Sequence, residues 1–168
     1  MGRSAPVDGF ALAYDRSGAG DPVVLLHGWP GDRTDHQDLA PLLEGDAEVV
    51  ALDLRGFGAS DKHPAPPAEA YSAAAQARGV LGLVDELGLA DPVLAGYDIG
   101  SRIAQAAARA APERVRALVI SPPLPGGGRR VLEPEAQREF WYQPFHNLSL
   151  VEELLDGRPE AVMAPGGP

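Results

Sequence analysis

Asp98 is the residue of this chain whose setting best suits it for chemistry. It lies in Gly96-Tyr97-Asp98-Ile99-Gly100, between an apolar strand pattern and an alanine-rich helix pattern. The spacing small-x-Asp-x-small is typical of a sharp strand-to-helix turn, where flanking side chains would collide with neighbouring backbone. Such a turn would present the Asp98 carboxylate as a nucleophile, ionised beside a helix N-terminus that favours negative charge. The alternative is that Asp98 only caps the helix.

Two further loops follow apolar strand patterns and are expected near Asp98. One is His27-Gly28-Trp29-Pro30-Gly31, and the other runs from Asp53 to Asp61 with glycines at positions 56 and 58. In a parallel sheet the loops after successive strands meet at one edge. We therefore expect the three loops to form one site.

Apolar runs that alternate with helical patterns predict the elements that position these loops. The expected strands cover residues 10–14, 23–27, 48–54, 93–95 and 115–120. A Thr34-x-x-Gln37 capping box predicts a short helix with Leu39, Leu42 and Leu43 facing inward. A second helix is capped by Ser72, buries Val80, Leu83, Val84 and Leu87, and ends at Gly88. A third runs from Ile99 to Ala111. This alternation predicts an α/β fold with a mostly parallel sheet and helices on both faces.

The three loops together resemble those of the α/β-hydrolase family, and within it the epoxide hydrolases and haloalkane dehalogenases. The resemblance runs from about Val7 to Gly157. It implies an α/β-hydrolase fold in which the backbone N–H groups of Trp29 and Ile99 form an oxyanion hole. It also implies a hydrolase core over residues 1–124, followed by a linker and an incomplete helical cap over 125–168.

An aspartate at the centre of this turn favours displacement at saturated carbon. A serine would leave an ether that water does not readily cleave, whereas an aspartate leaves an ester with a carbonyl that water can attack. The expected reaction is therefore opening of an epoxide by Asp98 and hydrolysis of the ester to a diol. A haloalkane dehalogenase is the alternative enzyme.

The leaving group separates these two reactions. The segment 140–146 is similar to the one that carries the first cap tyrosine of epoxide hydrolases, so Tyr142 is expected to protonate the departing alkoxide. Alternatively, Tyr142 only packs in an aromatic cap core. Haloalkane dehalogenases usually have a tryptophan after the nucleophile to bind halide, and here that residue is Ile99. Arg102 matches a carboxylate-binding arginine of fluoroacetate dehalogenases, although an ion-pairing surface arginine is the simpler interpretation.

Composition excludes several other classes of function. A net charge of −10 argues against nucleic-acid binding, and no apolar run is long enough to cross a membrane. The chain has no cysteine, its histidines lack metal-ligand spacing, and no dinucleotide fingerprint follows its paired glycines, so we expect neither metal nor cofactor. His27, His36, His63 and His146 are interpreted as fold, loop or cap residues. We expect a cytoplasmic protein that acts on a small apolar molecule such as an epoxide; oligomeric state has no signal in the sequence.

The family mechanism also needs a histidine that activates water and an acid that orients it, both after the cap. The 168 residues end inside the expected cap, so we expect both groups to be absent and the last strand to have an uncovered edge. The chain alone is then expected to be alkylated once without turnover. A non-catalytic truncated fragment is the second alternative.

Overall fold

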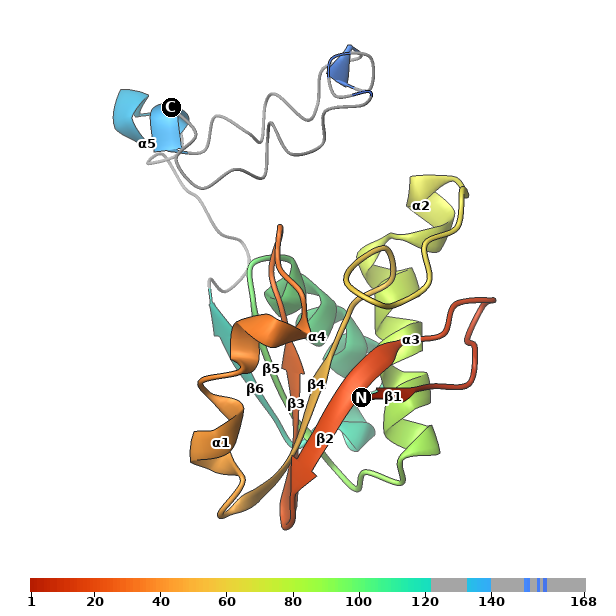
Figure 1. Ribbon diagram of the computed structural model, residues 1–168, viewed down its shortest axis with the longest axis vertical. Helices are drawn as coiled ribbons and strands as arrows, with labels where there is room; N and C mark the ends of the chain where they lie inside the picture. Colours follow the sequence, from red (N-terminus) through yellow and green to blue (C-terminus); the bar gives the residue numbers. More distant parts are fainter. Residues whose placement is uncertain (122–132, 140–149, 152–153, 155, 157–168) are drawn as a thin grey trace. The chain divides into compact units, whose positions relative to one another are not determined.

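The computed structural model describes residues 1–121, 133–139, 150–151, 154 and 156. Six strands form one sheet in the order β1-β2-β4-β3-β5-β6 (Figure 1). These strands are β1 (Gly2–Arg3), β2 (Ala13–Gly18), β3 (Asp21–Leu26), β4 (Ala47–Leu52), β5 (Val93–Tyr97) and β6 (Ala117–Ser121). Strands β4, β3, β5 and β6 run parallel, while β1 and β2 join antiparallel at the other edge. The expected mostly parallel sheet is confirmed.

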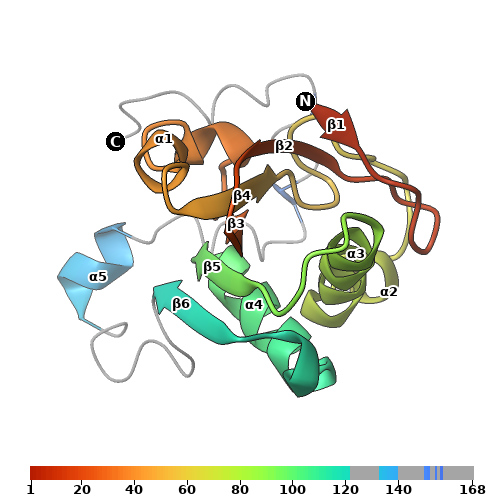
Figure 2. The ribbon, with the colours of Figure 1, turned by 90° about the horizontal axis from the view of Figure 1, so that it is seen from below.

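Helices lie on both faces of this sheet, as expected. The α-helices are α1 (Ala40–Leu43), α2 (Pro67–Ala70), α3 (Ala73–Glu86), α4 (Ile99–Ala110) and α5 (Pro134–Glu139), and two 3₁₀ turns are η1 (Arg33–His36) and η2 (Pro112–Arg114). Seen from below, α3 and α4 cover one face and α1 lies over β4 on the other (Figure 2). Contact between Leu25, Val49 and the partly buried Leu43 fills the α1 side, which has the smaller core.

The larger core lies between α3, α4 and the sheet, and α3 forms it as the sequence predicts. The Ser72 hydroxyl accepts a hydrogen bond from the Ala75 N–H and caps the helix. Val80, Leu83 and Val84 are buried against strand residues and Leu87 is partly buried. Gly88 follows with a φ of 66°, the left-handed conformation that commonly ends a helix. This core holds β3 and β5 in place beneath the loops of interest.

The prediction for the segment after β3 is partly wrong. Asp32, not Thr34, provides the cap: its side chain accepts from the Thr34 N–H at the start of η1. The α-helix begins only at Ala40, and its leucines do not all face inward, since Leu39 is 43% and Leu42 78% exposed. Pro41 explains the difference, because proline fits the first turn of a helix but cannot continue one from Thr34.

All five predicted strands differ from the observed ones at their boundaries. The strands expected over 23–27 and 48–54 are β3 (Asp21–Leu26) and β4 (Ala47–Leu52). The strand expected over 10–14 begins at Ala13 and continues to Gly18, because residues 14–18 pair with β4. The strand expected over 93–95 extends to Tyr97, and the last one covers 117–121. Within the described residues β6 is an edge strand, as expected, and Val119 on it is 62% exposed.

By its contacts the chain divides into two compact units, Met1–Leu124 and Pro125–Pro168. The sheet and the three loops belong to the first unit. Of the second unit the structure describes α5 and a few residues after position 149. No helix among the described residues is long and apolar enough to span a bilayer.

Candidate functional site

The turn at Asp98 has the sharp strand-to-helix geometry that the sequence predicts. Strand β5 ends at Tyr97, helix α4 begins at Ile99, and Asp98 between them adopts φ 49° and ψ −119°. This conformation is sparsely populated for a residue with a side chain. Asp98 makes no side-chain cap for α4, so the capping alternative does not describe its contacts. Instead, its half-buried carboxylate accepts a hydrogen bond across the sheet edge from the Trp29 N–H, at 2.9 Å from N to Oδ2.

Glycines on both sides make this turn possible. A Cβ at Gly96 would lie 2.6 Å from the Gly100 backbone, and one at Gly100 would lie 2.4 Å from the Leu26 carbonyl oxygen. Backbone atoms cannot move aside as a flexible side chain would, so larger residues here would force β3, β5 and α4 apart. The elbow is further tied by the Asp98 N–H, which donates to the Ser121 carbonyl, and by the Ser101 hydroxyl, which donates to the Asp98 carbonyl.

The loop after β3 brings the Trp29 amide to this carboxylate. His27 at its base is fully buried, and its Nε2 accepts from the Leu54 N–H at 3.0 Å. The proton of the ring therefore resides on Nδ1, which donates to the Gly28 carbonyl. Both ring nitrogens are used, as expected of a residue that holds a loop. On the other side of Asp98, Ile99 is the first residue of α4, a position whose N–H has no partner within a helix.

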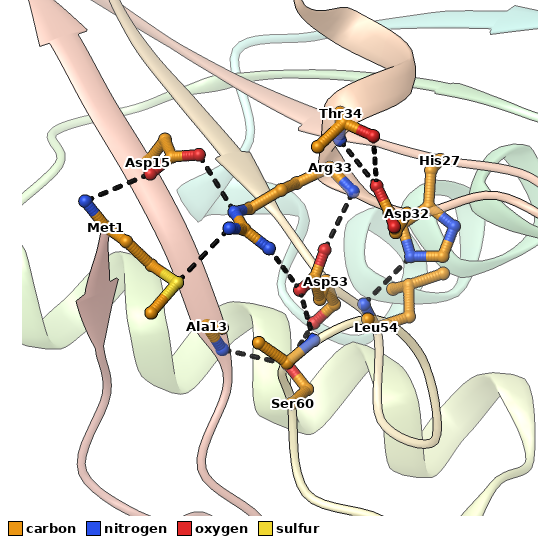
Figure 3. Close-up of polar contacts among 12 residues, drawn as sticks. Met1, Ala13, Asp15, His27, Asp32, Arg33, Thr34, Asp53, Leu54 and Ser60 are labelled. Carbon is orange, nitrogen blue, oxygen red and sulfur yellow. Dashed lines mark hydrogen bonds and ion pairs between the residues drawn. The ribbon is translucent and has the colours of Figure 1, made fainter.

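The loop after β4 is held by a second, buried aspartate. Asp53 accepts hydrogen bonds from the Arg33 N–H, the Arg33 guanidinium and the Ala59 N–H, each at 2.7 Å (Figure 3). The Ser60 hydroxyl donates to the Asp53 carbonyl. Asp15 also pairs with Arg33. Burial lowers the pKa of the Arg33 guanidinium, but the carboxylates of Asp15 and Asp53 raise it by more, so the pKa lies above its usual value. This network joins η1, β2 and the β4 loop.

A pocket of about 810 Å³ opens beside the elbow within the first unit. Trp29 and Ile99, which flank Asp98, lie on its wall, and Arg102 is on the same wall one turn further along α4. The other lining residues come from the β4 loop, the end of α2 and the start of α3, and they include Phe57, Lys62, His63, Tyr71 and Gln76. Asp98 does not itself line this pocket, but the next residue, Ile99, and the residue that donates to its carboxylate, Trp29, both do. A carboxylate held by an amide beside a pocket can attack a small bound electrophile.

Arg55 on the pocket wall is held in place by its surroundings. The side chain is fully buried, donates to the Val7 carbonyl, pairs with Asp8 and lies 5.0 Å from the centre of the Phe10 ring. Its backbone exchanges two hydrogen bonds with the Gln76 side chain. Because these contacts engage both charge and backbone, Arg55 serves to fasten α3 to the β4 loop.

The remaining residues singled out in the sequence lie in different settings. Tyr142 and His146 are outside the described residues. His36 is buried, and burial lowers the pKa of its imidazole. The His63 ring lies 4.8 Å from the Phe10 ring, tilted to it by 52°. Within the part of the chain that the structure describes, no group of three or more histidines and carboxylates could hold a metal ion.

Two interactions at the site were not predicted from the sequence. One is the Arg33–Asp53 ion pair, and the other is a hydrogen bond from the Tyr97 hydroxyl to Asp35. Both pairs join residues from different loops. The only sequence signal was that Tyr97 lies next to Asp98 and that Asp53 ends an apolar strand.

Comparisons with known proteins agree with this architecture. The model of a family described as alpha/beta hydrolase fold matches residues 21–151. The soluble epoxide hydrolase of Corynebacterium sp. (strain C12) is 34% identical over 122 residues, covering 73% of this chain and 41% of that protein. A haloalkane dehalogenase of Bradyrhizobium diazoefficiens is 33% identical over 153 residues, covering 90% and 44%.

A similar solved structure is that of an epoxide hydrolase mutant from Bacillus megaterium in complex with its product. It has a TM-score of 0.77 and 26% identity, and the match covers 95% of this chain and 58% of that one. The chain thus spans about half the length of the relatives that it matches.

Proposed function

The chain belongs to the α/β-hydrolase fold family, and we propose that Asp98 is the nucleophile of an epoxide hydrolase-like reaction. The observation that supports this most is the Asp98 conformation together with the bond from the Trp29 N–H to its carboxylate. A side chain that neither caps the helix nor closes an ion-pair network has little structural reason to be held in a strained turn. The cytoplasmic location remains a prediction.

In the first proposed step, a carboxylate oxygen of Asp98 attacks an epoxide carbon. The new C–O bond makes an alkyl ester, the ring C–O bond breaks, and the ring oxygen takes up a proton. The Trp29 N–H holds Oδ2, which leaves Oδ1 to attack. Tyr142 remains the predicted proton donor, although it lies outside the described residues.

In the second proposed step, water adds to the ester carbonyl and the diol is released. Negative charge then develops on the carbonyl oxygen, where the N–H groups of Trp29 and Ile99 would stabilise it. Removing one such donor typically slows the chemical step by a factor of about 10² or more. The step also needs a base to activate the water, and we assign no described residue to it.

The leaving group can be tested by intact-mass measurement on the 168-residue chain. We expect phenyl glycidyl ether to add one equivalent to the protein and 1-chlorohexane to add far less, since Ile99 offers no side-chain donor to a halide. Asp98→Asn, which keeps the shape but not the nucleophile, is the matched control and should gain no mass. Faster alkylation by the chloroalkane than by the epoxide would support the dehalogenase alternative instead.

A second candidate reaction is displacement of halide from an anionic haloacid. It is favoured by the charge of the pocket wall, where Lys62 and Arg102 are cationic and none of the described lining residues is acidic, whereas the charge of Arg55 is already paired with Asp8. Such a wall would offset repulsion between a carboxylate substrate and Asp98. Chloride release from chloroacetate, lost in Arg102→Gln, would support this candidate, and indifference to chloroacetate would exclude it.

A further inference from the structure

Tyr97, the residue directly before Asp98, connects the elbow to the loop after β3. Its hydroxyl donates a hydrogen bond to Asp35 Oδ2 at 2.5 Å, and the two residues are 62 positions apart in the chain. Tyr97 ends β5, whereas Asp35 lies in η1, so the bond spans two loops. A hydroxyl donating to a carboxylate at this distance makes a strong, charge-assisted hydrogen bond.

The turn that carries Trp29 rests directly on this pair. The Gly31 N–H donates to the Gly28 carbonyl and closes the turn around Trp29. A Cβ at Gly28 would lie 2.3 Å from the Tyr97 ring, and one at Gly31 would lie 1.7 Å from Asp35 Oδ2 and 3.0 Å from the Tyr97 oxygen. The turn can approach the pair this closely only because both of its end residues are glycines.

We propose that Tyr97 and Asp35 are positioning residues, which hold the turn so that the Trp29 N–H meets the Asp98 carboxylate. The consequence for the reaction rests on the proposed function of Asp98. Tyr97 fixes one end of the turn through its ring against Gly28, and Asp35 fixes the other end against Gly31. Without their bond the turn can shift, and a shift of a few tenths of an ångström weakens a hydrogen bond that is 2.9 Å long.

The state of the phenol agrees with this arrangement. Partial burial raises the pKa of Tyr97 most, and the hydrogen bond and negative charge of Asp35 raise it further, while the Gly28 backbone lowers it. The phenol therefore keeps its proton and remains a donor throughout the neutral range. Tyr97 also faces the negative charge of Asp98 and the ring of His36, whose own pKa is lowered by burial.

The test compares Tyr97→Phe, Asp35→Ala and the double variant with Tyr14→Phe, in the full chain. Tyr14→Phe is the matched control, because it removes the same hydroxyl from β2, away from the elbow. The first readout is hydrogen exchange of the Trp29 amide, followed by NMR. The second is alkylation by phenyl glycidyl ether, separated into its maximal rate and its half-saturating concentration.

We expect Tyr97→Phe and Asp35→Ala each to speed exchange at Trp29 and to lower the maximal alkylation rate about fivefold, with half-saturation unchanged. The double variant should match Asp35→Ala, because the bond between the two residues is already lost there. Asp35→Asn, which keeps an oxygen acceptor, should retain most of the rate. Tyr14→Phe should change neither readout.

The proposal is overturned if Trp29 exchange is unchanged in both single variants, even where their melting temperatures fall, because the pair would then be only structural. Additive effects in the double variant would overturn it too, since they exclude a shared bond. If the unmodified chain is not alkylated, the proposed function fails. The exchange of the Trp29 amide still decides the positioning role in that case.

Discussion

Asp53 and Asp98 follow the two strands that flank β3, yet the structure treats their carboxylates in opposite ways. Asp53 is fully buried and saturated by Arg33 and the Ala59 N–H, in an ion pair that ties three elements together. Asp98 is half-buried, is held by the Trp29 N–H, and sits in a strained backbone conformation. The same side chain is thus saturated by donors after β4, whereas after β5 it lies in a strained turn and accepts a hydrogen bond from one backbone amide.

Under the proposed function of Asp98, one aspartate at this sheet edge provides rigidity and the other provides reactivity. Donors that fill every position around a carboxylate remove its ability to attack anything else. The Asp53 network holds the β4 loop, which contributes residues to the pocket wall. If this interpretation is right, replacing Asp53 should cost stability, whereas replacing Asp98 should cost reactivity.

The largest effect is expected from Asp53→Asn. Removing one partner of a buried ion pair leaves Arg33 without its buried counter-charge, so the free energy of unfolding should fall by about 3 kcal/mol or more. Asp98→Asn should change it by less than about 1 kcal/mol. Urea unfolding monitored by tryptophan fluorescence measures both. Equal losses of unfolding free energy in the two variants would show that the two aspartates do not differ in their contribution to stability.

Gly100→Ala should have the next largest effect. The added Cβ would meet the Leu26 carbonyl at 2.4 Å and the His27 carbonyl at 2.6 Å, so overpacking should cost about 1–3 kcal/mol of unfolding free energy. Gly45→Ala is the matched control, because a Cβ there has no neighbour within 4 Å. Thermal unfolding of both variants measures the difference. A Gly100→Ala protein as stable as the control would mean that the elbow is wider than described.

Asp98→Gly separates strain from chemistry at a single position. Glycine adopts a positive φ without the cost that a side chain incurs, so the variant should be more stable than the unmodified chain by about 1 kcal/mol. It should also lose all alkylation by an epoxide. Denaturant midpoints and intact mass are the measurements, and a loss of stability would show that the Asp98 contacts outweigh the strain.

The smallest effect concerns pH and Asp15, at the outer end of the Asp53 network. Partial burial raises its pKa, but hydrogen bonds from the N-terminal ammonium and Arg33 outweigh this and hold the pKa below its usual value. A lowered carboxylate pKa adds stability above the unfolded pKa of about 3.9, and this is lost as pH falls through the folded value.

Asp15→Asn should therefore lower stability by only a few tenths of a kcal/mol at pH 6, because the Asp15 side chain is half exposed and solvent screens its charge. Near pH 2 Asp15 is protonated, so its charge no longer contributes and the variant and the unmodified chain should be equally stable. Melting temperatures across this pH range test the prediction. A difference that persists unchanged at pH 2 would mean that Asp15 acts by packing and not by charge.

Local patterns predicted the parts of the fold that depend on local sequence. The elbow follows from two glycines around Asp98, and α3 follows from the Ser72 cap, one apolar face and Gly88. The helix after β3 was predicted wrongly because Pro41 delays its start, a constraint that outweighs apolar spacing. The contacts Tyr97–Asp35 and Arg33–Asp53 depend on how the loops meet in space, which a pattern within one segment does not contain.

Peptide mapping of the epoxide-treated chain identifies directly which carboxylate reacts. After incubation with phenyl glycidyl ether, proteolysis and tandem mass spectrometry should locate one ester on Asp98 and none on Asp53, with no ester formed in Asp98→Asn. An ester on another carboxylate, or labelling of the Asp98→Asn chain at an undiminished rate, would contradict the assignment of Asp98 as the nucleophile.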